Sequence, residues 1–295
     1  MKNKSIFITA WNRDDLLKKS IYSLTLAEHY DKYKKFIIFQ DCNNDQENMI
    51  KKIDPEIVVV KKFYPVNTKL YQKMFLNLFS GFTKTFEEHS SDFSIHMEDD
   101  IIVSKDIFFF YEYVIKKYSK DRNFFAVNGM SKELVDYNLS LDYSKFIWGI
   151  CKCWGLHRSR WPALKNLWLK YYEKEKNINH PYDGPVEEYI KASTKYVIMP
   201  YRSLILEQLS NGCNSIDDPN YPGYKEWFLS FNSKKKKGDY NYNKKMPYHW
   251  RHDCIKYNLK NIVLCKVYNF LKKHLPITLK NLLGKVKKFY LYFIY

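Results

Sequence analysis

Three consecutive acidic residues, Glu98, Asp99 and Asp100, point more directly to chemistry than any other part of this chain. They close the apolar stretch 93–97 and are followed at once by a second one, 101–103. Carboxylates crowded at the end of a buried strand are costly unless a cation neutralises them. Mg²⁺ and Mn²⁺ bind one or two carboxylates together with substrate phosphates. The triplet therefore predicts an enzyme acting on a phosphorylated, activated donor; the alternative is that Asp99 and Asp100 only begin a solvated turn.

Strand and helix patterns alternate through the first half of the chain and must position this triplet. Strands separated by helices imply crossover connections and a mostly parallel sheet covered on both faces, so we predict an α/β fold. Apolar runs predict strands at 5–10, 36–39, 57–60, 93–97, 124–127 and 196–199. Apolar residues at helical spacing predict helices around 16–24 and at 70–86, 107–118, 158–172 and 183–192.

Polar residues follow three of these predicted strands. Arg13 follows the first, Asp41 the second, and the acidic triplet the fourth. In an open α/β sheet, ligands bind at the carboxyl ends of the strands, where the strand order switches, so the three features should converge on one edge. An arginine fork suits phosphate or a uracil carbonyl, and Asp41 could accept a hydrogen bond from a base or ribose. Taken singly, Arg13 and Asp41 would be surface residues or helix caps.

The motifs around these residues resemble those of glycosyltransferases with the GT-A fold. The stretches are FITAWNR at 7–13, FIIFQDC at 36–42 and HMEDDIIVS at 96–104, the last followed by DIF at 106–108. They are most similar to the Golgi α-mannoside β-1,2-N-acetylglucosaminyltransferase family and to related bacterial family-2-like transferases. The order and spacing of the motifs agree over residues 5–215.

This resemblance implies an inverting glycosyltransferase with a Rossmann-like, mostly parallel sheet, a UDP-sugar donor and Mn²⁺ (or Mg²⁺) as cofactor. The transferred sugar would be N-acetylglucosamine or another hexose. By the resemblance, Arg13 and Asp41 would contact the nucleotide and Asp99 the ribose. Asp100 would bind the metal, and Glu98 would lie near the transferred sugar.

Two further segments resemble parts of the same family. Trp154, in the Trp-rich stretch 148–161, would form an apolar wall for the sugar or acceptor, with core packing as the alternative. For Trp161 we expect core packing. Asn211, in the loop 210–215, would touch the diphosphate, unless this loop is only a tight turn.

An inverting transfer requires a base that accepts the proton of the attacking acceptor hydroxyl. By the resemblance this carboxylate lies at an acidic helix start, and Asp183 is our first choice. Gly184 and Pro185 depart from the family pattern there, so Glu187 and Glu188 stay as alternatives. Asp183 could also serve only as the cap of the following helix.

The composition predicts a globular catalytic domain over residues 1–230 and a basic, amphipathic helical extension over 231–295. The chain of 295 residues is 45% hydrophobic and carries a net charge of +17, and residues 254–295 contain no Asp or Glu. Such an extension suits an anionic membrane surface, or it packs back on the domain with its lysines outward. No fold signature of nucleic-acid binding accompanies the charge, so no nucleic-acid partner is expected.

We therefore expect a cytoplasmic enzyme, peripheral on the inner face of the membrane, that extends a saccharide or lipid-linked surface glycan. No apolar stretch reaches the ~18 residues of a spanning helix, and the six cysteines lack zinc-type spacing. Two alternatives are a catalytically inactive membrane-associated adaptor with this fold and a sugar nucleotidyltransferase. The second would need a phosphate loop rich in Gly and Lys/Arg, which residues 10–15 do not supply.

Overall fold

The computed structural model describes residues 3–130, 142–146, 150, 152–174, 183–200, 203–208 and 241–242. The chain divides into two compact units, residues 1–190 with 195–244, and residues 191–194 with 245–295. The fold described below is that of the first unit. The predicted domain boundary at 230 falls outside the described residues, as does the extension 231–295 apart from Asn241 and Tyr242.

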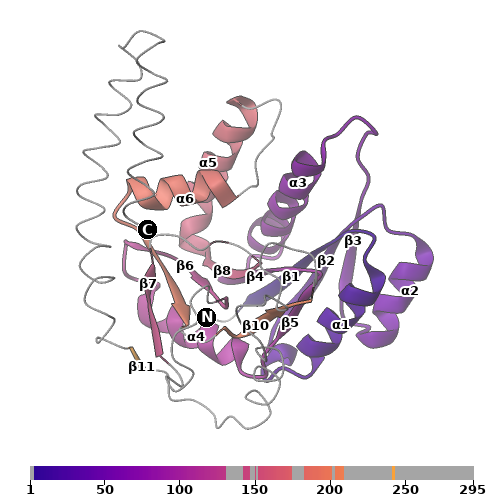
Figure 1. Ribbon diagram of the computed structural model, residues 1–295, viewed down its shortest axis with the longest axis horizontal. Coiled ribbons are helices and arrows are strands. Elements are labelled where there is room, and N and C mark those ends of the chain that lie inside the picture. Colours follow the sequence, from indigo (N-terminus) through magenta and orange to yellow (C-terminus); the bar gives the residue numbers. More distant parts are fainter. Residues whose placement is uncertain are drawn as a thin grey trace, which may run out of the picture. The chain divides into compact units, whose positions relative to one another are not determined.

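Helices and strands alternate along the chain as the sequence pattern predicts (Figure 1). The strands are β1 (Lys4–Ala10), β2 (Lys34–Gln40), β3 (Val58–Lys62), β4 (Phe93–Glu98), β5 (Ile101–Val103), β6 (Phe124–Asn128), β7 (Asp142–Phe146), β8 (Cys153–His157), β9 (Tyr196–Pro200), β10 (Ile205–Glu207) and β11 (Asn241–Tyr242). The α-helices are α1 (Asp14–Thr25), α2 (Asn44–Ile53), α3 (Leu70–Thr83), α4 (Ile107–Tyr118), α5 (Trp161–Lys174) and α6 (Asp183–Ala192). None of these described helices is long and apolar enough to cross a membrane.

The described strands form one large, mostly parallel sheet in the order β11-β7-β9-β6-β8-β4-β1-β2-β3. β1 pairs in parallel with both β2 and β4, and β2 pairs in parallel with β3. β8 lies antiparallel between β4 and β6. A separate small sheet pairs β5 with β10. The predicted α/β fold, a mostly parallel sheet flanked by helices, is confirmed.

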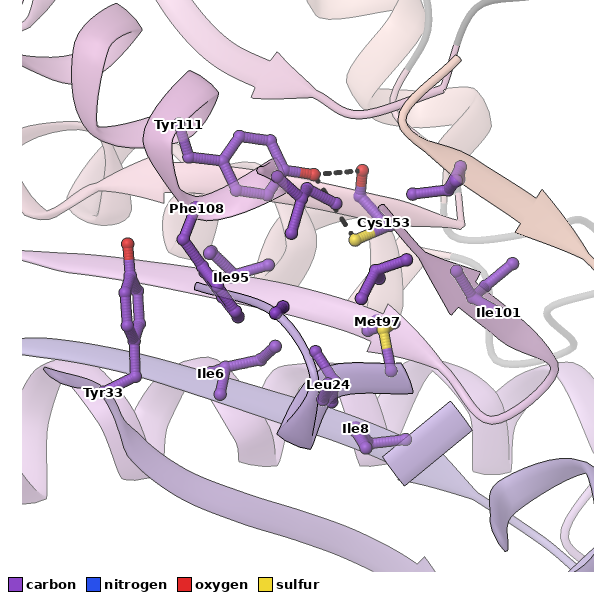
Figure 2. Packing of buried hydrophobic residues seen from close by; sticks show 14 of the residues in the cluster. Ile6, Ile8, Leu24, Tyr33, Ile95, Met97, Ile101, Phe108, Tyr111 and Cys153 are labelled. Carbon is purple, nitrogen blue, oxygen red and sulfur yellow. Dashed lines mark hydrogen bonds between the residues drawn. The ribbon is translucent and has the colours of Figure 1, made fainter. Parts of the chain in front are cut away.

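One face of the sheet packs against α1 and α4. Alternate residues of β1 and β4 point to this face, as the two-residue period of a strand requires. The Tyr111 hydroxyl on α4 donates to the backbone carbonyl of Cys153 at 2.9 Å, which ties the helix to β8 (Figure 2). The buried side chains that meet on this face include Ile6, Ile8, Leu24, Ile95, Met97, Phe108 and Tyr111 (Figure 2).

The opposite face packs against α3 and α5 through aromatic rings. Phe82 of α3 lies 4.8 Å from Phe7 of β1, 5.0 Å from Trp154 of β8 and 6.0 Å from Trp168 of α5, measured between ring centroids. The Trp154 side chain is fully buried in this cluster. The prediction that Trp154 walls the sugar site is therefore wrong, because a side chain enclosed by core aromatics does not face a cleft. The prediction of core packing for Trp161 is confirmed.

Two predicted helices differ from the observed ones at their ends. The helix predicted over 70–86 is α-helical only to Thr83, and the chain continues as a π-helical turn over Lys84–Glu88. The helix predicted over 158–172 begins with a 3₁₀ turn at Arg158–Arg160, and α5 proper starts at Trp161. A 3₁₀ turn is common at a helix end, whereas a π-helical turn is rare.

Candidate functional site

The candidate site lies at the point where the strand order of the sheet switches. From β1 the chain adds β2 and then β3 on one side, after which β4 pairs on the other side of β1. Because these strands are parallel, their carboxyl ends share one edge. Arg13, Asp41 and the acidic triplet all follow strands at this edge, so the predicted convergence of the three strand ends is confirmed. Ligands of open α/β sheets bind at such a point.

Arg13 joins the strand ends of β1 and β4 through ion pairs. Its guanidinium contacts both carboxylate oxygens of Asp99, and its Nη1 lies 3.0 Å from Oδ2 of Asp100. The backbone N–H of Trp11 also donates to Oδ2 of Asp99, at 3.1 Å. Both carboxylates are almost fully buried, whereas 36% of the Arg13 side chain is exposed. Arg13 therefore covers the two acids on their solvent side.

These ion pairs form in a desolvated environment, and the pKa values of Asp99 and Arg13 are both shifted. Burial raises the pKa of Asp99 to about 6, although Arg13 and the Trp11 N–H oppose this rise. Desolvation also opposes the charge on Arg13, but Asp99 and Asp100 outweigh it and raise the pKa of the guanidinium. Asp99 and Arg13 are therefore both charged at neutral pH, and Asp99 takes up a proton as the pH falls below its raised pKa of about 6.

Asp100 keeps one carboxylate oxygen that Arg13 does not engage. Its Oδ1 is buried and has no hydrogen-bond partner among the described residues. Burying a charged oxygen without a partner is costly, and a cation would satisfy it. No group of three or more His, Cys, Asp or Glu within the described ranges is placed to hold a metal ion. Asp100 thus fits an Mg²⁺ or Mn²⁺ ion whose other ligands are phosphate and water.

A second cation, Lys152, lies on the other side of the triplet. Its Nζ is 3.3 Å from Oε2 of Glu98 and 2.7 Å from Oε1 of Glu207, the last residue of β10. The backbone N–H of Glu98 donates to the carbonyl of Lys152 at 2.9 Å. Desolvation lowers the pKa of Lys152, but Glu98 and Glu207 outweigh it and raise the pKa overall. Lys152 therefore holds Glu98 in place and stays charged.

The backbone of the acidic turn is held by residues from two other elements. The Ser20 hydroxyl of α1 donates to the carbonyl of Asp99 at 2.8 Å, and the N–H of Gln208 donates to the carbonyl of Asp100 at 2.9 Å. The Gln208 side chain in turn donates to the Ser20 hydroxyl at 3.0 Å. Sequence reasoning missed these positioning residues, because their contacts arise only when distant segments fold together.

Three residues at this edge have a left-handed backbone. The φ angles of Asn12, Asp41 and Lys152 are 48°, 55° and 62°. Residues with a Cβ rarely adopt this region, and such strained positions cluster at functional sites. Asn12 and Asp41 belong to residue types that tolerate it, whereas a lysine is unusual there. The strain supports a functional interpretation of the same edge that carries the ion pairs.

The remaining predicted site residues lie farther along the same edge or on other elements. Asp41 is exposed directly after β2, where its Oδ2 accepts a hydrogen bond from the Gln40 amide at 3.0 Å. The three candidate bases lie on α6, and Asn211 lies outside the described residues. On α6, Asp183 and Glu187 are half-buried and Glu188 is exposed.

No protein-family model and no curated protein sequence matches this chain. Its structure is similar to solved structures at 10% sequence identity. A mannosyltransferase from Pyrobaculum calidifontis in complex with GDP-Man and Mn²⁺ matches with a TM-score of 0.44, over 98% of this chain and 80% of that one. An active-site mutant of LgtC matches with a TM-score of 0.47, over 84% and 99% of the two chains. A cytidylyltransferase from Leptospira borgpetersenii matches with a TM-score of 0.42, over 67% and 76%.

Structural similarity at 10% sequence identity does not assign an activity to this chain. They also do not single out the N-acetylglucosaminyltransferase family that the sequence motifs resemble. The function is therefore argued below from the residues of this chain.

Proposed function

We propose that this protein is a glycosyltransferase whose nucleotide-sugar donor binds at the carboxyl edge of β1, β2 and β4. The observation that carries the proposal is the buried ion-pair cluster of Arg13, Asp99 and Asp100 at the switch point of the sheet. Buried ion pairs are weak evidence for stability, because desolvation offsets most of their attraction. A buried, charged cluster at the ligand-binding edge, beside three residues with a left-handed backbone, is better explained by binding of a polar ligand.

Each residue of the cluster has a role in the proposed donor complex. Arg13 and Asp41 contact the nucleotide, which we take to be UDP, and Asp99 accepts a hydrogen bond from the ribose. Glu98 lies beside the transferred sugar, N-acetylglucosamine or another hexose, and Lys152 keeps it oriented. Because the Arg13 side chain is partly exposed, it can contact the nucleotide while its pairing with the two acids holds it in place.

Asp100 supplies the carboxylate oxygen that would hold Mn²⁺ or Mg²⁺, and the unpartnered Oδ1 supports this role. When bound, the ion neutralises the charge that develops on the diphosphate leaving group. Asn211 remains our candidate for a diphosphate contact.

We assign the base of an inverting transfer to Asp183, with Glu187 and Glu188 as alternatives on the same helix. The acceptor oxygen attacks C1 of the sugar, its proton passes to the carboxylate, and the bond to the nucleotide diphosphate breaks with its electrons leaving on UDP. The acceptor would be a saccharide or a lipid-linked glycan at the cytoplasmic face of a membrane, with the extension 231–295 on the anionic surface. The acid-free, lysine-rich sequence at 254–295 supports this location.

The test is release of UDP from UDP-sugars in the presence of Mn²⁺ and saccharide acceptors. Asp183→Asn should bind UDP as the wild type does and lose about 10²-fold or more in turnover, the usual contribution of a general base. Glu187→Gln and Glu188→Gln are measured in the same way, since these residues are the alternative bases on the same helix. If Glu187→Gln shows the loss instead, the base lies one helical turn further on. A wild-type chain that turns over no nucleotide sugar would contradict the proposed function.

A further inference from the structure

Exposed apolar side chains gather on the connection from β3 to α3. The exposed fractions are 69% for Phe63, 96% for Val66 and 49% for Leu70. Tyr71 and Met74, on the first turns of α3, are exposed as well. Single apolar residues on a surface are ordinary, but several within a dozen residues indicate an interaction site. These five residues are called the 63–74 surface below.

The 63–74 surface lies in a strongly basic part of the chain. No Asp or Glu occurs between Ile57 and Phe86, whereas four lysines lie at or beside the apolar residues: Lys61, Lys62, Lys69 and Lys73. Of these, Lys61 forms an ion pair with Glu47 at 2.7 Å. Apolar side chains interleaved with lysines are typical of segments that insert into the headgroup region of an anionic membrane.

The 63–74 surface belongs to the edge of the sheet that carries the candidate site. β3 pairs in parallel with β2, so the chain leaves β3 at the same edge at which Arg13 follows β1 and the acidic triplet follows β4. The connection loops outward past the strands before α3 returns along the sheet (Figure 1). Trp11, also exposed, lies at this edge directly after β1.

We propose that the 63–74 surface docks this protein on an anionic lipid bilayer. Phe63, Val66 and Leu70 would enter the boundary between headgroups and acyl chains, while the neighbouring lysines pair with lipid phosphates. An aliphatic residue as exposed as Val66 favours a bilayer over a soluble anion, which would use the lysines alone. This docking does not depend on the proposed function. If that function holds, docking turns the donor edge toward the membrane, where a lipid-linked acceptor is presented.

The test is co-sedimentation of the full chain with lipid vesicles. We expect binding to vesicles of phosphatidylcholine mixed with phosphatidylglycerol, and weak binding to phosphatidylcholine alone. The combined substitution Phe63→Ser, Val66→Ser and Leu70→Ser should weaken binding by about tenfold or more, because three apolar side chains no longer leave water. Lys69→Glu with Lys73→Glu should abolish the preference for the anionic vesicles.

The matched control is Tyr22→Ser with Leu26→Ser. These residues are 60% and 62% exposed, but they lie at the end of α1, the helix that starts at the donor edge and ends away from it. The control variant should bind vesicles like the wild type. Circular dichroism and thermal unfolding should show that all variants keep the wild-type fold, as expected for exposed positions.

Unchanged vesicle affinity of the triple variant would overturn the proposal and assign membrane binding to other parts of the chain. An equal loss in the control would overturn it as well. So would a wild-type dimer that the triple variant converts to a monomer, because the 63–74 surface would then join two copies of this chain. Donor hydrolysis without lipid should stay at the wild-type rate in the triple variant, which separates a failure of docking from a failure of the proposed function.

Discussion

Asp99 and Asp100 are neighbours that share one arginine, but their surroundings give them different capacities. Both oxygens of Asp99 are engaged by Arg13, and one also accepts from the Trp11 N–H. Asp100 uses only Oδ2, and its buried Oδ1 is without a partner among the described residues. Asp99 is therefore suited to orienting a hydroxyl and holding Arg13, whereas Asp100 is suited to binding a cation.

Donor binding should weaken as the pH falls below 6, because Asp99 then takes up a proton. Burial raises its pKa from 3.8 to about 6, and the protonated carboxyl no longer pairs with Arg13. Calorimetric titration of UDP should show about a tenfold loss of affinity for each pH unit below that value. Asp99→Asn should bind weakly on both sides of it. A wild-type affinity that stays constant through this range would contradict the role of Asp99.

Protonation of Asp99 has opposite effects on donor binding and on stability: it weakens donor binding but stabilises the folded chain. Its pKa in the folded chain exceeds its ordinary value of 3.8, so the folded state binds the proton more tightly than the unfolded state does. The contribution of Asp99 to the free energy of unfolding therefore rises as the pH falls from 6 toward 3.8. Loss of UDP affinity over this range would thus not arise from unfolding at Asp99.

The acidic triplet and Arg13 could be found from sequence, but Lys152 and its partner Glu207 could not. Glu98, Asp99 and Asp100 follow an apolar strand, and that local pattern already implies a charged strand end. Lys152 and Glu207 are 55 residues apart and meet only because β8 and β10 approach β4 and β5 from different parts of the chain. No local pattern indicates such a pairing.

At the scale of elements, α3 lies close against β1 because Gly81 has no side chain. A Cβ at Gly81 would lie 2.1 Å and 2.2 Å from two ring carbons of Phe7, whose side chain is fully buried. Core aromatics surround that ring, so it has little room to move.

Gly81→Ala should lower the free energy of unfolding by about 1–3 kcal/mol, the usual cost of overpacking a core. Urea unfolding measures this effect. Gly184→Ala is the matched control, because Gly184 also lies in a helix and nothing lies within 4 Å of its added Cβ. The control should be stabilised by up to about 1 kcal/mol, since alanine is the better helix former. Equal effects in the two variants would contradict the close approach of α3 to β1.

Elements with strong apolar periodicity could be predicted, and weakly apolar ones could not. The predicted helix at 107–118 coincides with α4, because its apolar positions recur at helical spacing. α2 was missed because its sequence is mostly polar, although Asn43 and Gln46 form a capping box that signals a helix start. β8 was missed because it is short and contains Gly155, which is uncommon in strands.

At the scale of the whole molecule, the chain order of the strands creates the site. Placing β4 beside β1 after β2 and β3 have been added brings Arg13 and the acidic triplet together from segments more than 80 residues apart. The alternation of strands and helices was enough to predict this convergence. The acceptor side could not be predicted as far, because the shape of a cleft depends on how loops fold, and no local sequence pattern indicates that.

Nucleotide and metal should bind to the donor site cooperatively. Asp100 keeps one carboxylate oxygen without a hydrogen-bond partner among the described residues, and no group of three or more potential ligands occurs in the same ranges. Mn²⁺ should therefore bind weakly alone and tightly with UDP, whose phosphates complete its ligands. Coupling between two ligands is reciprocal, so Mn²⁺ must raise the affinity for UDP by the same factor.

Calorimetric titration of UDP into the wild-type chain and into Asp100→Ala, each with Mn²⁺ and with a chelator, tests this coupling. We predict that Mn²⁺ strengthens UDP binding to the wild type by about tenfold or more, a typical size for coupled ligands. Asp100→Ala should keep the affinity measured with chelator and lose the enhancement by Mn²⁺. Equal UDP affinity of the wild type with Mn²⁺ and with chelator, or full enhancement in Asp100→Ala, would contradict a metal-assisted donor site at this edge of the sheet.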